Sequence, residues 1–169
     1  MTKLSARLAN LTGGIAMINI GGVTESEARE KHARVVDALH ATRAAVAEGI
    51  VPGGGTALIR CMPVLDELRG DHEVQIGINI IKKAVMAPLM QIVDNAGGNQ
   101  GSVVVDKVRS LEGNVGYNAL TDAYEDLIKS GVIDPVKVTR SALQHASSIS
   151  GLLLTTDCII ANMENSVKA

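Results

Sequence analysis

The stretch Ala44-Ala45-Val46-Ala47-Glu48-Gly49-Ile50-Val51-Pro52-Gly53-Gly54-Gly55 joins the predicted end of one long helix to the start of another. Three consecutive glycines remove every Cβ atom from this part of the surface, so another backbone or a flat ligand such as a nucleotide can approach closely. The triplet matches neither GxxxxGK[ST] nor GxGxxG. Taken alone, it fits a tight turn or close helix packing as well as a contact with phosphate or ribose.

Composition indicates one folded domain with a core built from helices. Of the 169 residues, 46% are hydrophobic and 20% are charged, with two Tyr, no Phe and no Trp. A core of Val, Ile, Leu, Met and Ala favours closely packed helices. A net charge of -2 gives no electrostatic reason to bind nucleic acid or an anionic membrane. We expect no membrane span, buried thiols at Cys61 and Cys158, and a soluble intracellular protein.

The N-terminal part is predicted to hold a short helix over 3–11, a strand over 15–20 and one long helix. Thr24 and Glu27 match a capping box, in which Glu27 reaches back to the Thr24 amide. The helix that they open is expected to end at Glu48, before Gly49. An apolar stripe on this helix, expected to face a core, consists of Ala28, His32, Val35, Leu39, Thr42 and Val46.

The rest of the chain is predicted to be mostly helical. Helices are expected over 56–68 and 72–96, and Pro63 and Pro88 should interrupt the first and kink the second. Residues 102–108 fit a strand or a short helix. The remaining predictions are a turn between short extended pieces over 113–120, a helix over 121–130, a helix from Asp134-Pro135 to Leu154 with Asp134 as N-cap, and a terminal strand over 158–161.

No residue pattern by itself names a reaction, because neither a catalytic triad order nor an HExxH motif can be written from the sequence. Asp37 falls opposite the apolar stripe of its helix. A solvated surface carboxylate is the simpler explanation of Asp37 from periodicity alone, and a helix cap is the simpler explanation of Asp134. Something large could nevertheless reach Asp37, because its neighbours on that face are all small: Ala33, Ala41 and Ala44.

Together these landmarks resemble the group I chaperonins, the GroEL-like family of bacteria, mitochondria and plastids. The family signature is matched in register by Ala44-Ala45, Glu48 and Gly53-Gly54-Gly55. Ala47 departs from it, because an acidic residue or Gln is usual at that position. The segments that also resemble the family are Arg34-Val35-Val36-Asp37-Ala38-Leu39-His40-Ala41-Thr42-Arg43, Gly116-Tyr117-Asn118-Ala119, Asp134-Pro135 and Val138-Thr139-Arg140-Ser141-Ala142-Leu143.

The resemblance implies a mainly α fold of chaperonin equatorial-domain type with a few short β strands, preceded by an intermediate-domain α/β segment. It places 1–15 at the end of the apical domain, 16–47 in the intermediate domain and 48–169 in the C-terminal half of the equatorial domain. The chain thus resembles the last third of a subunit. The family's phosphate loop, and the apical groove for clients and co-chaperonin, are not in it.

The resemblance also implies an ATP site. Asp37 corresponds to the carboxylate that swings over bound ATP and positions or activates the attacking water. ATP and Mg²⁺ are the implied cofactors, with most phosphate and Mg²⁺ contacts outside this chain and no metal site expected within it. The other contacts, carried over by position, are Gly54 near the ribose and phosphates, Asn118 and Ala119 along the adenine, Val132 on the base, where a bulkier Ile is common, and Asp134 accepting from ribose hydroxyls.

Three functions are consistent with the sequence. The first is part of an ATP-driven folding chamber, a chaperonin ATPase whose isolated fragment is expected to be inactive. Its partners would be other subunits in seven-membered rings, usually double, and, through the absent apical domain, a co-chaperonin and unfolded clients. The second is a non-catalytic ring-contact module, and the third a small nucleotide-binding protein. The expected location is the bacterial cytoplasm, or the mitochondrial matrix or plastid stroma.

Overall fold

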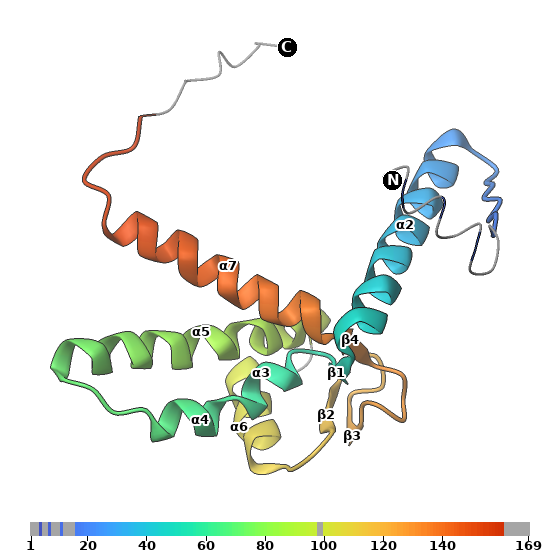
Figure 1. The fold of residues 1–169 in the computed structure, drawn as a ribbon. Coiled ribbons are helices and arrows are strands. Elements are labelled where there is room, and N and C mark those ends of the chain that lie inside the picture. The colour runs from blue at the N-terminus through green and yellow to red at the C-terminus, as the bar shows by residue number, and fades with distance from the viewer. Residues whose placement is uncertain (1–3, 5–6, 8–10, 12–15, 98–99, 161–169) are drawn as a thin grey trace, which may run out of the picture. The chain divides into compact units, whose positions relative to one another are not determined.

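The structure, a computed structural model, is mostly helical with a few short strands, as the sequence predicts (Figure 1). It describes residues 4, 7, 11, 16–97 and 100–160. The chain divides into two compact units, Met1–His40 and Ala41–Ala169, and each is described by itself. The elements in order are α2 (Glu25–Glu48), β1 (Ile50–Pro52), α3 (Thr56–Arg60), α4 (Met62–Glu67), α5 (His72–Ala96), α6 (Gly101–Ser110), β2 (Val115–Asn118), β3 (Ala123–Asp126), β4 (Ile133–Pro135) and α7 (Val136–Leu154).

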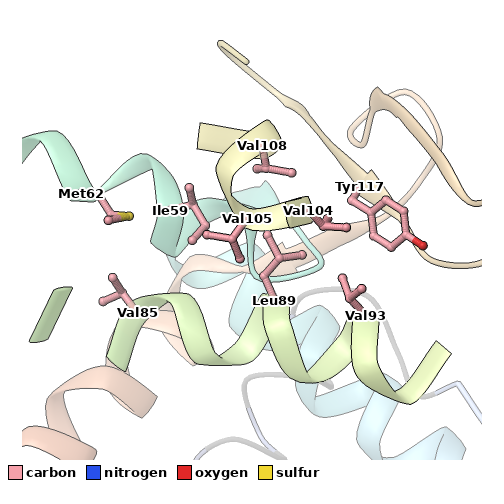
Figure 2. Close-up of a cluster of buried hydrophobic side chains, with 9 residues drawn as sticks. All are labelled: Ile59, Met62, Val85, Leu89, Val93, Val104, Val105, Val108 and Tyr117. Carbon is pink, nitrogen blue, oxygen red and sulfur yellow. The ribbon is translucent and has the colours of Figure 1, made fainter. Parts of the chain in front are cut away.

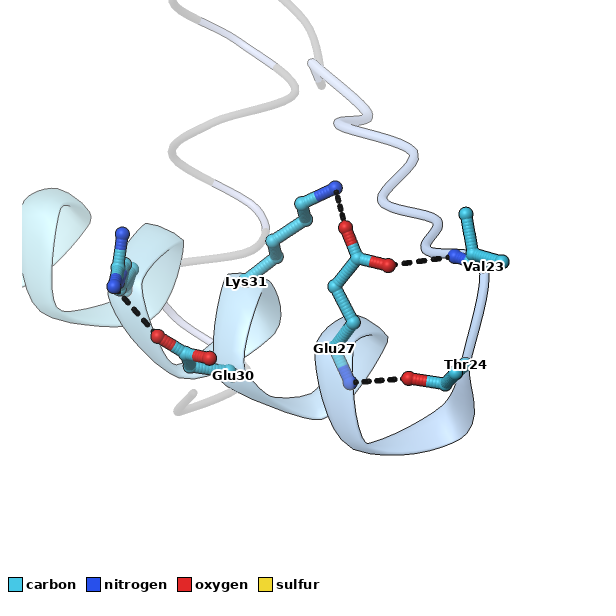
Figure 3. A network of polar contacts seen from close by, with 6 residues as sticks. Val23, Thr24, Glu27, Glu30 and Lys31 are labelled. Atoms are coloured by element: carbon cyan, nitrogen blue, oxygen red, sulfur yellow. Dashed lines mark hydrogen bonds and ion pairs between the residues drawn. The ribbon is translucent and has the colours of Figure 1, made fainter.

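Helix α2 begins at the predicted capping box. The Thr24 hydroxyl accepts a hydrogen bond from the Glu27 amide at 3.2 Å. The Glu27 carboxylate accepts from the Val23 amide at 2.8 Å, one residue before the expected partner, and pairs with Lys31 at 2.7 Å (Figure 3). The Lys31 hydrogen bond, and after it the Val23 bond, lower the pKa of Glu27. These contacts fix the start of the helix through side chains that adjoin it in sequence.

Two other predictions for the N-terminal part of the chain, the strand and the buried stripe, are wrong. Residues 16–20 form no strand, while Ile15 lies outside the described residues. Of the helix predicted over 3–11, only Leu4, Arg7 and Leu11 are described, and they are helical. The stripe predicted on α2 faces no core in the described residues, since no side chain of α2 is buried and Val46 is 84% exposed.

Helix α2 ends at Glu48, as the sequence predicts, and Gly49 follows it. Gly49 adopts a positive φ of 87°, and its amide donates to the Ala45 carbonyl at 2.7 Å. Glycine adopts this left-handed conformation without the strain that a Cβ atom would add. The chain then enters β1, which pairs antiparallel with β4 and sets Val51 opposite Asp134.

A core of nine buried apolar side chains joins α3, α4, α5, α6 and β2 (Figure 2). The 72–96 helix is confirmed as α5, which starts at an Asp71 cap that accepts from the Val74 amide and runs on through Pro88. Its buried side chains are Val85, Leu89 and Val93, while Ile92 is 36% exposed. The cluster consists of Ile59, Met62, Val85, Leu89, Val93, Val104, Val105, Val108 and Tyr117.

Two further expectations about helices are settled by these elements. The helix predicted over 56–68 is interrupted, as expected beside Pro63, and becomes α3 and α4 with Cys61 between them. The segment that fitted either a strand or a short helix is helical and forms most of α6. Three valines in succession do not make it a strand, because Val104, Val105 and Val108 lie on one helical face and enter the core.

The helix predicted over 121–130 is wrong, because this segment forms the second strand of a hairpin and the turn after it. Strand β3 pairs antiparallel with β2, and Asp122 in the connection has a φ of +53°. The Asp126 carboxylate accepts from the Ile128 and Lys129 amides at 3.2 Å each, so a side chain closes the following turn. The segment 113–120, predicted to be a turn between short extended pieces, instead contains strand β2.

The start of α7 and the end of the described chain also differ from prediction. Asp134 lies in β4 and does not cap α7; the N-cap position belongs to Pro135. Residues 158–160 form no strand, and Ala161 is outside the described residues. Cys61 and Cys158 are free, as expected, but both are exposed.

By length and composition alone, α5 is long and apolar enough to cross a membrane, although we expected no such segment from the sequence. The helix carries adjacent lysines, and Lys82 pairs with Asp66 of α4 at 2.7 Å. Its buried residues pack against α3 and α6 in the core. These contacts are those of a core helix in a folded domain.

Candidate functional site

The glycine turn lies where three other segments meet. A Cβ atom at Gly53 would lie 3.1 Å from the Val132 carbonyl, and one at Gly55 would lie 2.9 Å from the Leu89 nitrogen. Gly54 has a φ of +63°, and a Cβ atom there would lie 3.5 Å from the Tyr117 carbonyl oxygen. Close backbone packing is therefore shown for this turn. A ligand contact at Gly54 stays a prediction.

Val132 is held beside the turn by its backbone. Its carbonyl accepts from the Gly53 amide at 2.9 Å, and its own amide donates to the Leu127 carbonyl at 2.8 Å. The side chain is half-buried. This pairing extends the β1–β4 contact by one residue and brings segments 50–53 and 132–135 together.

Asp134 is a charged residue at this junction, opposite Val51 in the β1–β4 pair. Burial raises the pKa of its carboxyl group, because a low-dielectric surrounding disfavours the charged form. It lines a cavity of about 480 Å³ between the glycine turn, α5 and α7. The residues that share this cavity are Gly54, Gly55, Leu58, Ala84, Val85, Pro88, Ile92, Thr139, Ala142, Leu143 and Ala146.

A second cavity, of about 250 Å³, meets Asp134 from the end of α2 and also contains Ile50, Ile133 and Pro135. Both cavities are apolar apart from Asp134 and threonine hydroxyl groups. A carboxylate on an apolar wall can accept hydrogen bonds from hydroxyl groups of a ligand whose flat part packs on the wall. No Lys or Arg is among the described residues that line either cavity, so these walls offer no side-chain charge to phosphates.

Asn118 and Ala119 occupy the end of β2 and the start of the hairpin turn. Asn118 is only 8% exposed, and its carboxamide bonds to Glu125 and to the Leu120 amide. Ala119 packs against the core cluster. The backbone of this strand reaches the glycine turn through the Tyr117 carbonyl.

The structure therefore brings Gly54, Val132 and Asp134 to one junction, with the strand that ends in Asn118 alongside. Asp37 lies on α2 in the N-terminal unit, and its side chain is exposed. Sequence reasoning missed Glu125, because a helix over 121–130 would have directed it away from Asn118. Alternation of side chains along a strand was the signal that would have found it. Among the described residues, no three His, Cys, Asp or Glu are grouped as a metal would require.

The sequence model of the TCP-1/cpn60 chaperonin family matches residues 3–164, almost the whole of the chain.

Proposed function

Because the chain belongs to the TCP-1/cpn60 chaperonin family, we propose that it is the C-terminal third of a group I, GroEL-like subunit and carries one wall of the subunit's ATP pocket. Membership supports a chaperone role in protein folding and assembly with other chaperonin subunits. Within the proposal, 1–15 ends the apical domain, 16–47 belongs to the intermediate domain and 48–169 to the equatorial domain.

One observation carries the ATP wall: Asp134 and the glycine turn line the same cavity, although they lie far apart in the sequence. In the proposal, Asp134 accepts from the ribose hydroxyls and Gly54 lets the sugar and phosphates approach. Val132 and the Asn118–Ala119 backbone border the base. ATP supplies the energy of the folding cycle, and Mg²⁺ neutralises its phosphates.

The charge of the cavity limits what this chain contributes. Since no cation is among the described residues that line it, phosphate and Mg²⁺ contacts are assigned to other parts of the subunit. Asp37, exposed on α2, is proposed to position the attacking water in the complete subunit. The isolated chain should therefore hydrolyse ATP poorly. ATP hydrolysis by this chain at a substantial rate, lost in Asp37→Ala, would contradict this division of roles.

Isothermal titration of the chain with ATP tests the proposed wall. We expect weak binding that Asp134→Ala abolishes, because the ribose hydroxyls lose their acceptor. Asp106→Ala is the matched control, since Asp106 is an exposed carboxylate on α6 and should bind like the parent chain. An absence of binding at millimolar ATP, or equal binding by the Asp134 variant, would refute the ATP wall.

A second function, as a ring-contact module, is favoured by the exposed end of α7. Ile149, Leu152 and Leu154 are 58%, 63% and 83% exposed, and Ile160 beyond the helix is 95% exposed. Apolar side chains gathered in this way are typical of a surface that another chain or segment covers. This role needs no nucleotide, so it would remain if the titration showed no binding.

A further inference from the structure

We propose that Glu125 is a positioning residue for the base-binding edge of this site. Its carboxylate fixes the carboxamide of Asn118, and the carboxamide fixes the backbone of the turn at Ala119 and Leu120. The inference rests on the proposed ATP wall, to which it adds a residue that does not itself meet the nucleotide.

The contacts form a short relay from β3 to the turn. Nδ2 of Asn118 donates to Oε1 of Glu125 at 2.6 Å, and Oδ1 of Asn118 accepts from the Leu120 amide at 3.0 Å. Asn118 is 8% exposed, so its side chain faces the hairpin and has little surface left for a ligand. The groups that remain to border a base are therefore the backbone atoms of the turn.

Glu125 determines which way the carboxamide points. A carboxylate only accepts hydrogen bonds and a backbone N–H only donates, so the amino group must face Glu125 and the oxygen must face Leu120. Turning the carboxamide over would replace two attractive contacts with two repulsive ones around the buried Asn118 side chain. The orientation is thus fixed from both ends.

Strand register explains how Glu125 reaches Asn118. Gly116 pairs with Glu125 and Asn118 pairs with Ala123, so all four residues lie on the same face of the hairpin. The contact is diagonal, a distance that a long side chain can span. Gly116 contributes no side chain opposite Glu125, which leaves the carboxylate free to lean toward Asn118.

Two substitutions in the full chain separate this role from general stability. Glu125→Ala removes the acceptor, so the turn loses its fixed backbone. We expect ATP affinity to fall roughly tenfold, the loss of one charge-assisted hydrogen bond. The ratio of ATP to GTP affinity should fall as well, because only the base edge is disturbed. Glu125→Gln keeps an acceptor oxygen, so it should retain most of the ATP affinity and most of the ratio of ATP to GTP affinity. Glu67→Ala, at an exposed glutamate of α4, is the control.

Amide exchange measured by NMR tests the relay without any nucleotide. The Leu120 amide should exchange faster in Glu125→Ala than in the parent chain, while the Glu67→Ala chain should match the parent. Unchanged Leu120 exchange would overturn the inference, as would faster exchange with an unchanged ATP to GTP ratio. If the parent chain bound no nucleotide, the proposed ATP wall would fail, and Leu120 exchange would still decide whether Glu125 positions the turn.

Discussion

Gly55 combines a backbone conformation and a contact that both require glycine. Its φ is +75°, and a Cβ atom there would lie 2.9 Å from the Leu89 nitrogen and 3.1 Å from the Leu89 Cα. Leu89 is fully buried in the core cluster, so α5 cannot yield locally. The third glycine of the triplet thus serves packing of α3 on α5, and like Gly54 it lines the cavity that contains Asp134.

Gly55→Ala should destabilise the chain by about 2–4 kcal/mol, the sum of left-handed strain and overpacking against Leu89. Gly97→Ala is the matched control, because Gly97 has a φ of +77° and open space where the Cβ would be. It should lose only about 1–2 kcal/mol, from strain alone. Urea unfolding followed by circular dichroism measures both, and equal losses would show that the Leu89 contact is relieved without cost.

At the scale of elements, one arginine links three pieces of structure. Arg60 of α3 donates to the carbonyls of Val108 at 2.8 Å, Gly113 at 3.0 Å and Val115 at 2.6 Å. The Val108 carbonyl lies near the end of α6, and the Val115 carbonyl lies at the start of β2. Burial lowers the pKa of the Arg60 guanidinium. The side chain thus ties the core helices to the strand that ends at Asn118.

Arg60→Met should destabilise the chain by about 2–4 kcal/mol, because three carbonyls lose a charged donor while the apolar stem is kept. Arg60→Lys should lose less, since an ammonium group can still reach part of the set. Arg69→Met is the control: Arg69 is exposed and donates to the Asp66 carbonyl nearby, so its loss should stay within about 0.5 kcal/mol. If thermal unfolding showed equal losses of stability in Arg69→Met and Arg60→Met, the proposed link through Arg60 would be refuted.

The elements that the sequence predicted correctly are those with local signals. The helix α5 has its Asp71 cap and its apolar period within one stretch, and α2 has a capping box at one end and Gly49 at the other. The hairpin was missed, because Tyr124, Leu127 and Ile128 recur at the three- and four-residue steps that are typical of a helix. Its strand character depends on pairing with β2 and on Tyr117 packing on Tyr124 at 5.5 Å.

At the scale of the whole molecule, the C-terminal unit has a closed core on one side and exposed apolar residues on the other. The cluster around Leu89 and Val93 is fully buried, whereas no side chain of α7 is buried. Exposed apolar surface of this kind favours association. The large apolar side chains exposed on α7 are Val138, Leu143, Ile149, Leu152, Leu153 and Leu154.

The purified chain should therefore self-associate, with an apparent mass in static light scattering that rises with concentration. Leu152→Glu should reduce this, because a charge on the exposed face resists burial. Ser148→Glu is the control on the same helix, since Ser148 is exposed and not apolar. A monomer at all concentrations would contradict the prediction. So would an equal effect of the two substitutions, which would assign the change to net charge.

For the candidate site, the residues were predicted from the sequence, whereas only the fold shows which of them lie close together. Family resemblance gave Gly54, Asn118, Ala119, Val132, Asp134 and Asp37 by position alone. The structure brings Asp134 into one cavity with Gly54, but as a strand residue paired with Val51 and not as the predicted helix cap. The relay through Glu125 was missed, because the contact depends on strand register, which a helix prediction removes.

The sequence by itself determined the two long helices α2 and α5, the residues at which they start, and the glycine turn, because a helix closes its hydrogen bonds between residues four apart and its caps lie next to it. Only the tertiary structure decided the pairing of β1 with β4, the hairpin, and which apolar faces are buried. A strand needs a partner that local sequence does not contain, and burial depends on what packs against a face. The glycine triplet shows both: its turn is written in the sequence, and its contacts with Val132, Tyr117 and Leu89 exist only in the fold.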